Sequence, residues 1–373
     1  MTTLRLAVVT GTRAEFGLLT PVMRAIADHD ALELSVIASG AHLVGDEPTL
    51  RDVETLFSVD AMVPMQVVGH VGRLHDARAC GRGISGFADA FDRLGVGVVV
   101  VLGDRIEAFA AASAGSVMGV PVVHLHGGDV AEGVADEAMR HAITKLAHLH
   151  LPATRASAGR IMRMGEDAWR VHEVGSPAAD VVRACDPMGD EAWDDLGRPE
   201  VVVLHHPCGL SDESERGFAG AIDAATSGMR TLWLAPNHDP GRGSVIAVRG
   251  ASRAHLVEHL PSISFTGMLK RLASSGGVLV GNSSCALIEG AIVGLACVDI
   301  GPRQRGRERC ANVVHIDTPD PDAVRDAIGH ARGLEIDADA HPYGDGRTGE
   351  RAARLIAETA FSDPRWLRKR NAY

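Results

Sequence analysis

The sequence contains very little lysine. Only three of its 37 basic residues are lysines, namely Lys145, Lys270 and Lys369. An anion held by charge must therefore be held mainly by arginine side chains or backbone N–H groups. The formal net charge of -11 argues against a general nucleic-acid-binding protein, because such a protein needs surplus positive charge to neutralise phosphates. Aromatic residues make up only 4%, which also argues against a base-stacking surface.

Paired cysteines and long apolar runs are missing as well. The six cysteines form no C-x-x-C pair and match no zinc motif, which predicts a reduced, cytoplasmic protein without a bound metal. No signal peptide is recognisable, and no stretch reaches the ~18 apolar residues that a membrane span needs. The 46% of hydrophobic and 23% of charged residues are typical of an ordered globular protein, and 373 residues suggest two or three domains.

Short valine-rich runs alternate with helical patterns along the chain. The runs that predict strands are Leu4–Thr10, Leu34–Ser39, Val96–Leu102, Val120–Leu125, Val201–Leu204, Thr231–Ala235, Gly277–Val280, Ala296–Ile300 and Val313–Ile316. The stretches that predict helices include Leu18–Asp28, Leu74–Leu94, Ile106–Met118 and Asp136–Ala147. This alternation predicts βαβ units and parallel sheets. We interpret the acidic stretch Cys185–Pro199 as a linker and expect two doubly wound α/β domains around a cleft. Ligands of such sheets bind beyond the carboxyl ends of the strands.

Two polar motifs follow predicted strands early in the chain. Gly11–Gly17 (GTRAEFG) is a glycine-bearing turn into a helix, where Arg13 would add a bidentate anion contact. The alternative is a structural turn with a solvated arginine. Asp104 and Arg105 follow the strongest predicted strand, and the alternative for Asp104 is the N-cap of a helix that begins at Ile106.

The densest group of ionisable residues begins with the segment His124–Asp129, which contains His124, His126 and Asp129. Asp136, Glu137 and Arg140 follow it on a glycine-rich loop and the first turn of a helix, an arrangement that suits proton transfer. One alternative is a metal held by His124 and His126, which the lack of an H-E-x-x-H or carboxylate-rich pattern disfavours. Another is that Asp136 and Glu137 are acidic residues favoured by the helix dipole.

Four further motifs follow strands in the second half of the chain. They are His205–Pro207, Pro236–Gly241, Gly281–Cys285 with Glu289 beyond it, and Gly301–Arg309. Ser283 and Ser284 would cradle a phosphate, Glu289 would bind a ribose hydroxyl, and the arginine-rich loop would clamp an anion. Each motif also has a purely structural alternative. In the order given above, these are a histidine at a strand end, a plain turn, a serine N-cap and a solvated basic loop. A serine hydrolase is disfavoured because no G-x-S-x-G motif is present.

In order and spacing, these motifs resemble the hydrolysing UDP-N-acetylglucosamine 2-epimerases of the sialic-acid pathway. The matching segments are TRAEFG at Thr12–Gly17, GDR at Gly103–Arg105, His126–His150, HHP at His205–Pro207, PNHDPG at Pro236–Gly241, GNSSCALIE at Gly281–Glu289, RQRGRE at Arg303–Glu308 and YGDG at Tyr343–Gly346. The resemblance covers about residues 5–355. It implies the GT-B arrangement, with two Rossmann-like domains (residues 1–185 and 186–350) facing a central cleft. A C-terminal helical segment, residues 351–373, would pack back on the first domain.

The resemblance also implies a reaction without a metal or redox cofactor. A base would remove the C2 proton of the sugar while UDP leaves from C1. Water would then add across the resulting glycal with inversion at C2, which yields N-acetylmannosamine and UDP. The implied partner is a UDP- or GDP-linked amino sugar, and the implied assembly is a homodimer or homotetramer.

Site residues are carried over from the family position by position. The resemblance assigns the nucleotide to Arg13, Asn237, Ser283, Ser284, Glu289 and Arg303, and the charge of the basic loop adds Arg307. His206 matches the histidine near the diphosphate. Asp104 and either Asp136 or Glu137 match acidic positions near the sugar, with His42 and Arg105 as supporting residues.

His126 departs from the family pattern, because several members have glutamate at this position in an H-x-E-G-G segment. Histidine titrates near neutral pH, so His126 would take over the acid/base role. Alternatively, it marks a different sugar, such as N,N'-diacetylbacillosamine linked to UDP or GDP. A non-hydrolysing 2-epimerase and a non-catalytic nucleotide-sugar binding module remain open alternatives.

Overall fold

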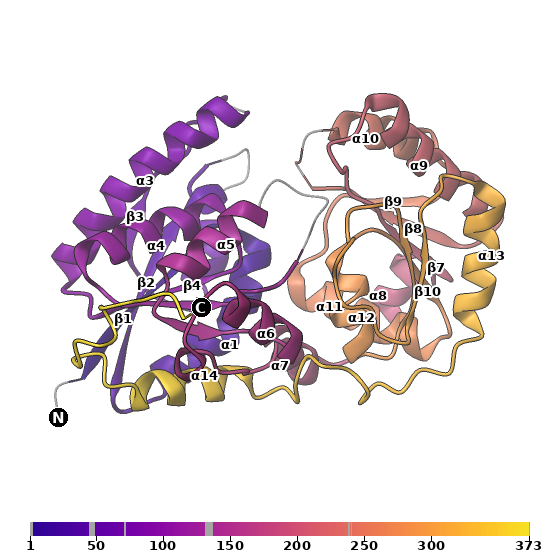
Figure 1. Cartoon of the computed structure of the whole chain (residues 1–373). Helices are drawn as coiled ribbons and strands as arrows, with labels where there is room; N and C mark the ends of the chain where they lie inside the picture. Colours follow the sequence, from indigo (N-terminus) through magenta and orange to yellow (C-terminus); the bar gives the residue numbers. More distant parts are fainter. Residues whose placement is uncertain are drawn as a thin grey trace. The chain divides into compact units, whose positions relative to one another are not determined.

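The computed structural model describes residues 3–44, 49–70, 72–130, 137–237, 239 and 241–372. The chain divides into two compact α/β units (Figure 1). Unit 1 comprises Met1–Asp129, Asp136–Asp180 and Pro342–Tyr373, and unit 2 comprises Val130–Ala135 and Val181–His341. Among the described helices, none is long and apolar enough to cross a membrane.

Unit 1 contains a six-stranded parallel sheet with the strand order β3-β2-β1-β4-β5-β6. The strands are β1 (Leu4–Thr10), β2 (Leu32–Ser39), β3 (Val59–Val63), β4 (Val98–Leu102), β5 (Val122–Leu125) and β6 (Leu149–Leu151). Every residue of β4 is buried, as expected of a strand that is covered on both faces.

Helices cover both faces of this sheet. They are α1 (Arg13–Ala27), α2 (Leu50–Glu54), α3 (Arg73–Leu94), α4 (Ile106–Met118), α5 (Glu137–Leu146), α6 (Arg155–Arg163) and α14 (Thr348–Glu358), with short 3-10 turns η1 (Gly40–His42) and η2 (Ala168–Arg170). The helix α7 (Pro177–Ala184) begins in unit 1 and ends in unit 2. Apolar residues of α1 and α14 share one core with the sheet, and those of α3 and α4 share the other. Figure 1 shows α14 beside α1, and Gly349 of α14 fits there because a Cβ would lie 2.5 Å from the Pro21 carbonyl oxygen.

Unit 2 repeats the same plan with the strand order β12-β11-β10-β7-β8-β9. Its strands are β7 (Val201–Leu204), β8 (Thr231–Leu234), β9 (His255–Val257), β10 (Val278–Gly281), β11 (Ala296–Ile300) and β12 (Val313–Ile316). Its helices are α8 (Asp190–Asp195), α9 (Asp212–Thr226), α10 (Arg242–Ala251), α11 (Ser262–Ser274), α12 (Glu289–Ile292) and α13 (Pro321–Arg332), with the 3-10 turn η3 (Ser284–Ala286).

Both strand orders place a topological switch point in the middle of a sheet. In unit 1 it lies between β1 and β4, and in unit 2 between β7 and β10. The chain winds outward in opposite directions from these pairs, so the loops after their carboxyl ends separate and leave room for a ligand. The predicted α/β class with two Rossmann-like halves is confirmed.

The predicted elements differ from the structure in a few places. The short edge strands β3, β6 and β9 are absent from the prediction. The predicted linker Cys185–Pro199 contains α8, whose Trp193 is buried in the core of unit 2. Asp104 is not a helix N-cap, because Arg105 occupies that position before α4.

Candidate active site

Arg140 joins the acidic residues of unit 1. Its guanidinium, only 4% exposed, forms an ion pair with Asp104 and donates to Glu137 Oε2 at 3.2 Å. It also donates to the Asp129 carbonyl oxygen at 3.1 Å. A buried arginine of this kind needs carboxylate partners, so it fixes the first turn of α5 against the loop after β4. The structure thus brings Asp104 and Glu137 together, while Asp136 lies outside the described residues.

His126 lies in the loop after β5, with its backbone in the left-handed region at φ 58°. Its Nδ1 lies 3.0 Å from Asp129 Oδ2, and its Nε2 lies 3.1 Å from Ser176 Oγ. Ser157 Oγ donates to the other Asp129 oxygen at 2.7 Å. Because a carboxylate only accepts, we assign the Nδ1–H tautomer, which leaves Nε2 to accept from Ser176 in the neutral ring. Ser176, which the sequence prediction missed, is therefore part of this cluster, together with Asp129 of the predicted ionisable group.

His124 has a structural role. Its Nε2 donates to the Gly103 carbonyl oxygen at 2.8 Å, and its Nδ1 lies 3.3 Å from Thr144 Oγ1. Burial lowers its pKa to about 3, so the ring is neutral at physiological pH. Within the described part of the chain, no group of three or more His, Cys, Asp or Glu side chains is arranged to hold a metal ion.

Arg13 and His42 lie after neighbouring strands, β1 and β2. Arg13 Nε donates to Asp52 Oδ2 at 2.7 Å. The His42 ring is buried between the hydroxyls of Thr10 (3.0 Å) and Thr49 (2.6 Å). Burial lowers the pKa of His42 to about 4, so it acts there as a neutral hydrogen-bonding residue.

Glu107 connects the loops at the switch point of unit 1. Its buried carboxylate accepts from Gln66 Nε2 at 2.6 Å and from Arg105 Nε at 3.3 Å. Gly40, at φ +58°, approaches so closely that a Cβ would lie 2.4 Å from Glu107 Oε1. Arg105, a predicted supporting residue, is thus oriented by a carboxylate that was not on the predicted list.

A second carboxyl group, that of Glu15, is buried beside Glu107. Glu15 Oε2 accepts from the Gly11 amide at 2.8 Å. Burial raises the pKa of Glu15 to about 8, and the nearby charge of Glu107 acts in the same direction. At neutral pH this group is therefore mostly the neutral acid.

Asn282 is the centre of the polar cluster in unit 2. Its Oδ1 accepts from the His206 amide at 2.7 Å, and its Nδ2 donates to the His206 carbonyl oxygen at 2.8 Å. The Asn237 amide donates to His206 Nδ1 at 3.0 Å, so the His206 proton resides on Nε2. Burial and the nearby Arg303 lower the pKa of His206 to about 3, which makes it a neutral donor through Nε2–H.

The arginine-rich loop divides into two kinds of residue. Arg303 is largely buried and lies 3.6 Å from Asp239 and 3.4 Å from the Asn282 carbonyl oxygen. Arg305 and Arg309 are instead engaged with Asp317 and Asp299. Arg307 Nε donates to the Val130 carbonyl oxygen at 2.9 Å. Only Arg303 of the four is thus joined to the His206 cluster by a described contact.

The segment after β10 forms a 3-10 turn, whereas a serine N-cap would have begun an α-helix there. Gly281, at φ +144°, approaches Leu204 so closely that a Cβ would lie 2.1 Å from its carbonyl oxygen. Ser283 Oγ accepts from the Cys285 amide at 3.4 Å, which favours a tight turn over an α-helix. Ser283 and Ser284 still lie directly beside Asn282, and Glu289 begins the short helix α12.

Several buried polar atoms of this cluster have no hydrogen-bond partner among the residues that the structure describes. They are Arg303 Nε, Asn237 Oδ1, Gln304 Oε1 and both ring nitrogens of His205. Buried polar groups are rarely left unpaired, because each one costs free energy. At the switch point of unit 2 these atoms lie around Asn282, whose carbonyl oxygen both Arg303 and Gln304 contact.

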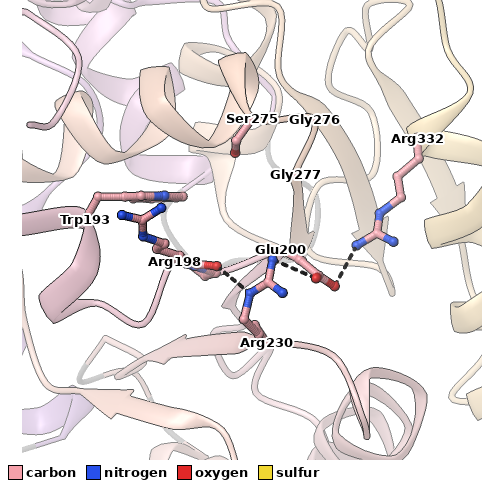
Figure 2. Close-up of a pocket in the computed structure, with 9 residues that line it drawn as sticks. Trp193, Arg198, Glu200, Arg230, Ser275, Gly276, Gly277 and Arg332 are labelled. Atoms are coloured by element: carbon pink, nitrogen blue, oxygen red, sulfur yellow. Dashed lines mark hydrogen bonds and ion pairs between the residues drawn. The ribbon is translucent and has the colours of Figure 1, made fainter. Parts of the chain in front are cut away.

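Unit 2 also contains a hollow of about 460 Å³ that none of these cluster residues lines, and Figure 2 shows the residues that do. Its lining includes Glu200, Arg230 and Gly277, which immediately precede β7, β8 and β10. Glu200 contacts Arg230 at 2.7 Å and Arg332 at 3.8 Å. The hollow therefore lies at the amino ends of the strands, opposite the edge that carries His206 and Asn282.

Comparisons with known proteins agree with this arrangement. The family described as UDP-N-acetylglucosamine 2-epimerase matches residues 24–357. A UDP-N,N'-diacetylbacillosamine 2-epimerase (hydrolyzing) from Legionella pneumophila is 32% identical in an alignment of 380 positions that covers 98% of each chain. A UDP-N-acetylglucosamine 2-epimerase from Neisseria meningitidis serogroup B is 30% identical over 368 residues, which cover 94% of each chain.

The fold is also shared with solved structures. A crystal structure of UDP-GlcNAc 2-epimerase from Neisseria meningitidis, bound to UDP-GlcNAc, matches with a TM-score of 0.78 at 14% identity. The match covers 95% of this chain and 100% of that one. With a family match over most of its length and two curated relatives along nearly all of it, the chain belongs to the UDP-N-acetylglucosamine 2-epimerase family of enzymes.

Proposed function

We propose that the enzyme is a hydrolysing 2-epimerase that converts UDP-N-acetylglucosamine and water into N-acetylmannosamine and UDP. The observation that carries the proposal is the pair of clusters at the two switch points. One contains carboxylates and histidine that suit proton transfer, and the other contains neutral and cationic donors that suit a diphosphate. The Legionella relative, named as hydrolyzing, supports hydrolysis as the outcome.

The proposed reaction has two steps. A base takes the proton from C2 while the C1–O bond breaks, and UDP leaves with the bonding electrons. The product of this step is a glycal with a C1=C2 double bond. Water then gives its hydroxyl to C1, and a proton adds to C2 from the face that inverts it. Because the C2 proton is very weakly acidic, stabilisation of the departing diphosphate contributes directly to the rate.

The cluster of unit 2 would bind the nucleotide. His206 Nε2–H and Arg303 would donate to the diphosphate oxygens, and Asn237 would assist them. Ser283 and Ser284 would hold phosphate through their hydroxyls and backbone. Glu289 would accept from the ribose, and Arg13 and Arg307 would add charge for the anion.

The cluster of unit 1 would handle the sugar. Asp104 and either Glu137 or Asp136 would transfer protons. Arg140 sets the positions of Asp104 and Glu137. His126 would exchange a proton through Nε2, the nitrogen that Ser176 contacts. Arg105, oriented by Glu107, and the neutral His42 would support the sugar.

UDP-N,N'-diacetylbacillosamine is the second candidate substrate. The Legionella relative that carries this name is 32% identical along 98% of the chain. A panel of UDP- and GDP-linked amino sugars, assayed for release of nucleoside diphosphate, distinguishes the two candidates. The sugar with the highest kcat/KM identifies the substrate.

Phosphorus NMR and a reaction in D₂O test the chemistry. Free UDP supports hydrolysis, whereas a new UDP-sugar signal would indicate a non-hydrolysing epimerase. Deuterium should appear at C2, and product that keeps its C2 hydrogen would contradict proton abstraction. Asp104→Asn, His126→Ala and His206→Ala should each lower kcat/KM by about 10²-fold or more. His330→Ala, at an exposed position of α13, is the control; full turnover in all three site variants would refute the site.

A further inference from the structure

The residues after α14 are fixed against unit 1. Phe361 and Trp366 are buried in the core that α14 shares with the sheet. Arg170 donates to the Trp366 carbonyl oxygen at 3.0 Å and lies over the Trp169 ring at 4.3 Å. The Ala372 amide donates to the Gly165 carbonyl oxygen at 2.8 Å. This segment, residues 361–372, is called the tail below.

Lys369 of the tail caps the carboxyl end of α5. Its Nζ donates to the carbonyl oxygens of Thr144 (3.4 Å), Lys145 (2.8 Å) and Ala147 (2.5 Å). A helix leaves its last carbonyl groups without internal partners, and the negative end of its dipole attracts a cation. Lys369 meets both needs, because it supplies three N–H donors and a positive charge at the same point.

Glu166 holds the ammonium of Lys369 in this position. Its carboxylate, whose side chain is 0% exposed, lies 2.8 Å from Lys369 Nζ and 2.6 Å from Lys145 Nζ. His150 Nε2 lies 3.1 Å from the same carboxylate. Two of the three lysines in the sequence thus converge on one buried carboxylate, and removing Lys369 would leave that carboxylate with Lys145 and His150 only.

The opposite end of α5 carries proposed site residues. Glu137 and Arg140 lie in its first turn, and Arg140 forms the ion pair with Asp104. A helix of ten residues is about 15 Å long and behaves as a stiff rod. A shift at its capped end therefore displaces the Arg140 guanidinium and, with it, the carboxylates that it orients.

We propose that Lys369 is a positioning residue for the reaction, because its contacts with Glu166 and the last carbonyls of α5 fix Arg140 against Asp104. The proposal rests on the proposed function. The predicted site residues all lie outside the tail, and the proposal gives the tail a role in catalysis. Lys369 touches no reacting atom, so it acts only through α5.

The charge of Lys369 is lost at mildly alkaline pH. Burial lowers the pKa of Lys369 to about 8, although Glu166 acts in the opposite direction. The other ionisable groups that face it are Lys145 on α5, His148 and His150 around β6, and Arg170. Burial lowers the pKa of both histidines to about 4, so neither changes charge in the same range.

Three lysine variants test the proposal through the pH dependence of nucleoside diphosphate release. Lys369→Met should lower kcat at pH 7 by about ten- to hundredfold, as expected when catalytic groups are displaced. Lys369→Arg keeps its charge above pH 8. It should restore part of kcat and remove the alkaline decline that we expect of the unaltered enzyme near pH 8. Lys270→Met is the matched control, because Lys270 binds the Cys185 carbonyl oxygen in unit 2.

A second measurement does not depend on activity. With lysine labelled with ¹³C at Cε, the three lysines give three NMR signals, and the one that Lys369→Met removes should titrate near pH 8. Hydrogen exchange of the α5 amides should accelerate in Lys369→Met and not in Lys270→Met. An ordinary titration above pH 10, or a folded Lys369→Met enzyme with unchanged kcat, would overturn the proposal. If no sugar is turned over but the NMR titration and the hydrogen exchange both give the expected result, the proposed function is wrong and Lys369 still caps α5.

Discussion

Glu15 provides a sharp test of the electrostatics at the switch point of unit 1. Its carboxyl, on a residue only 6% exposed, accepts from the Gly11 amide and lies beside Glu107. The change is Glu15→Gln, which keeps the shape and the accepting oxygen but removes the ability to ionise. Below pH 4.5, where Glu15 is protonated in both the folded and the unfolded chain, we expect this variant to have a stability close to that of the unaltered chain.

The magnitude follows from the pKa of Glu15, which is about 8 in the folded chain against 4.5 for an ordinary glutamate side chain. Between these values the folded chain keeps a proton that the unfolded chain has released. The free energy of unfolding therefore falls as pH rises from 4.5 to 8, by up to about 5 kcal/mol at about 1.4 kcal/mol per pKa unit. The variant lacks this ionisable group, so its free energy of unfolding does not fall in the same way. The difference between the variant and the unaltered chain should therefore grow by that amount between pH 4.5 and pH 8.

Urea unfolding followed by circular dichroism at pH 5, 6.5 and 8 measures this difference. Both chains contain the same unit 2, so their difference isolates the effect at Glu15. Glu213→Gln is the matched control, because Glu213 also lies in the first turn of a helix, α9, but is exposed. A difference for Glu15→Gln that changes by less than about 1 kcal/mol over this range would refute the reasoning.

Three other predictions concern unit 2. Gly281→Ala should destabilise the chain by about 3 kcal/mol or more in thermal unfolding, since a Cβ meets backbone at 2.1 Å and φ is +144°. Gly276→Ala, where nothing lies within 4 Å, should cost only the strain of its positive φ. Arg303→Lys should weaken UDP binding about tenfold or more in calorimetry, while Arg305→Lys at the exposed ion pair should leave it unchanged. ¹⁵N NMR should show His206 neutral from pH 5 to pH 8 with its proton on Nε2, in agreement with its pKa of about 3.

The central strands were predictable because burial on both faces leaves a simple signal. β1, β7 and β11 match their predicted bounds at both ends, and each is a short run dominated by apolar residues. The edge strand β12 also matches its predicted bounds, because its sequence VVHI is mostly apolar. The other edge strands were not predictable in the same way. An edge strand pairs on one side only, so its sequence need not be apolar throughout; β3 alternates buried and exposed residues.

Part of the candidate site followed from position alone. The rule that ligands bind after the carboxyl ends of strands selects Asp104, His206 and Ser283 without knowledge of packing. Ser176 shows what this rule misses. It lies 50 positions from His126 in the chain, in a segment without other polar motifs, and only the fold brings the two side chains together. Its role is therefore a property of tertiary packing and leaves no local pattern in the sequence.

The division of unit 1 along the chain has a consequence for folding during synthesis. Its sheet is complete once β6 has been made, but α14 and the tail are made only after the whole of Val181–His341. At about 5–20 residues per second, the roughly 200 residues between β6 and α14 take about 10–40 s to make. Throughout that interval the apolar face of α1 that receives α14 has no cover, and Glu166 lacks the ammonium of Lys369. Unit 2 can therefore finish folding before unit 1. A nascent chain whose synthesis stalls within unit 2 would expose the apolar face of α1, which could then aggregate with other chains.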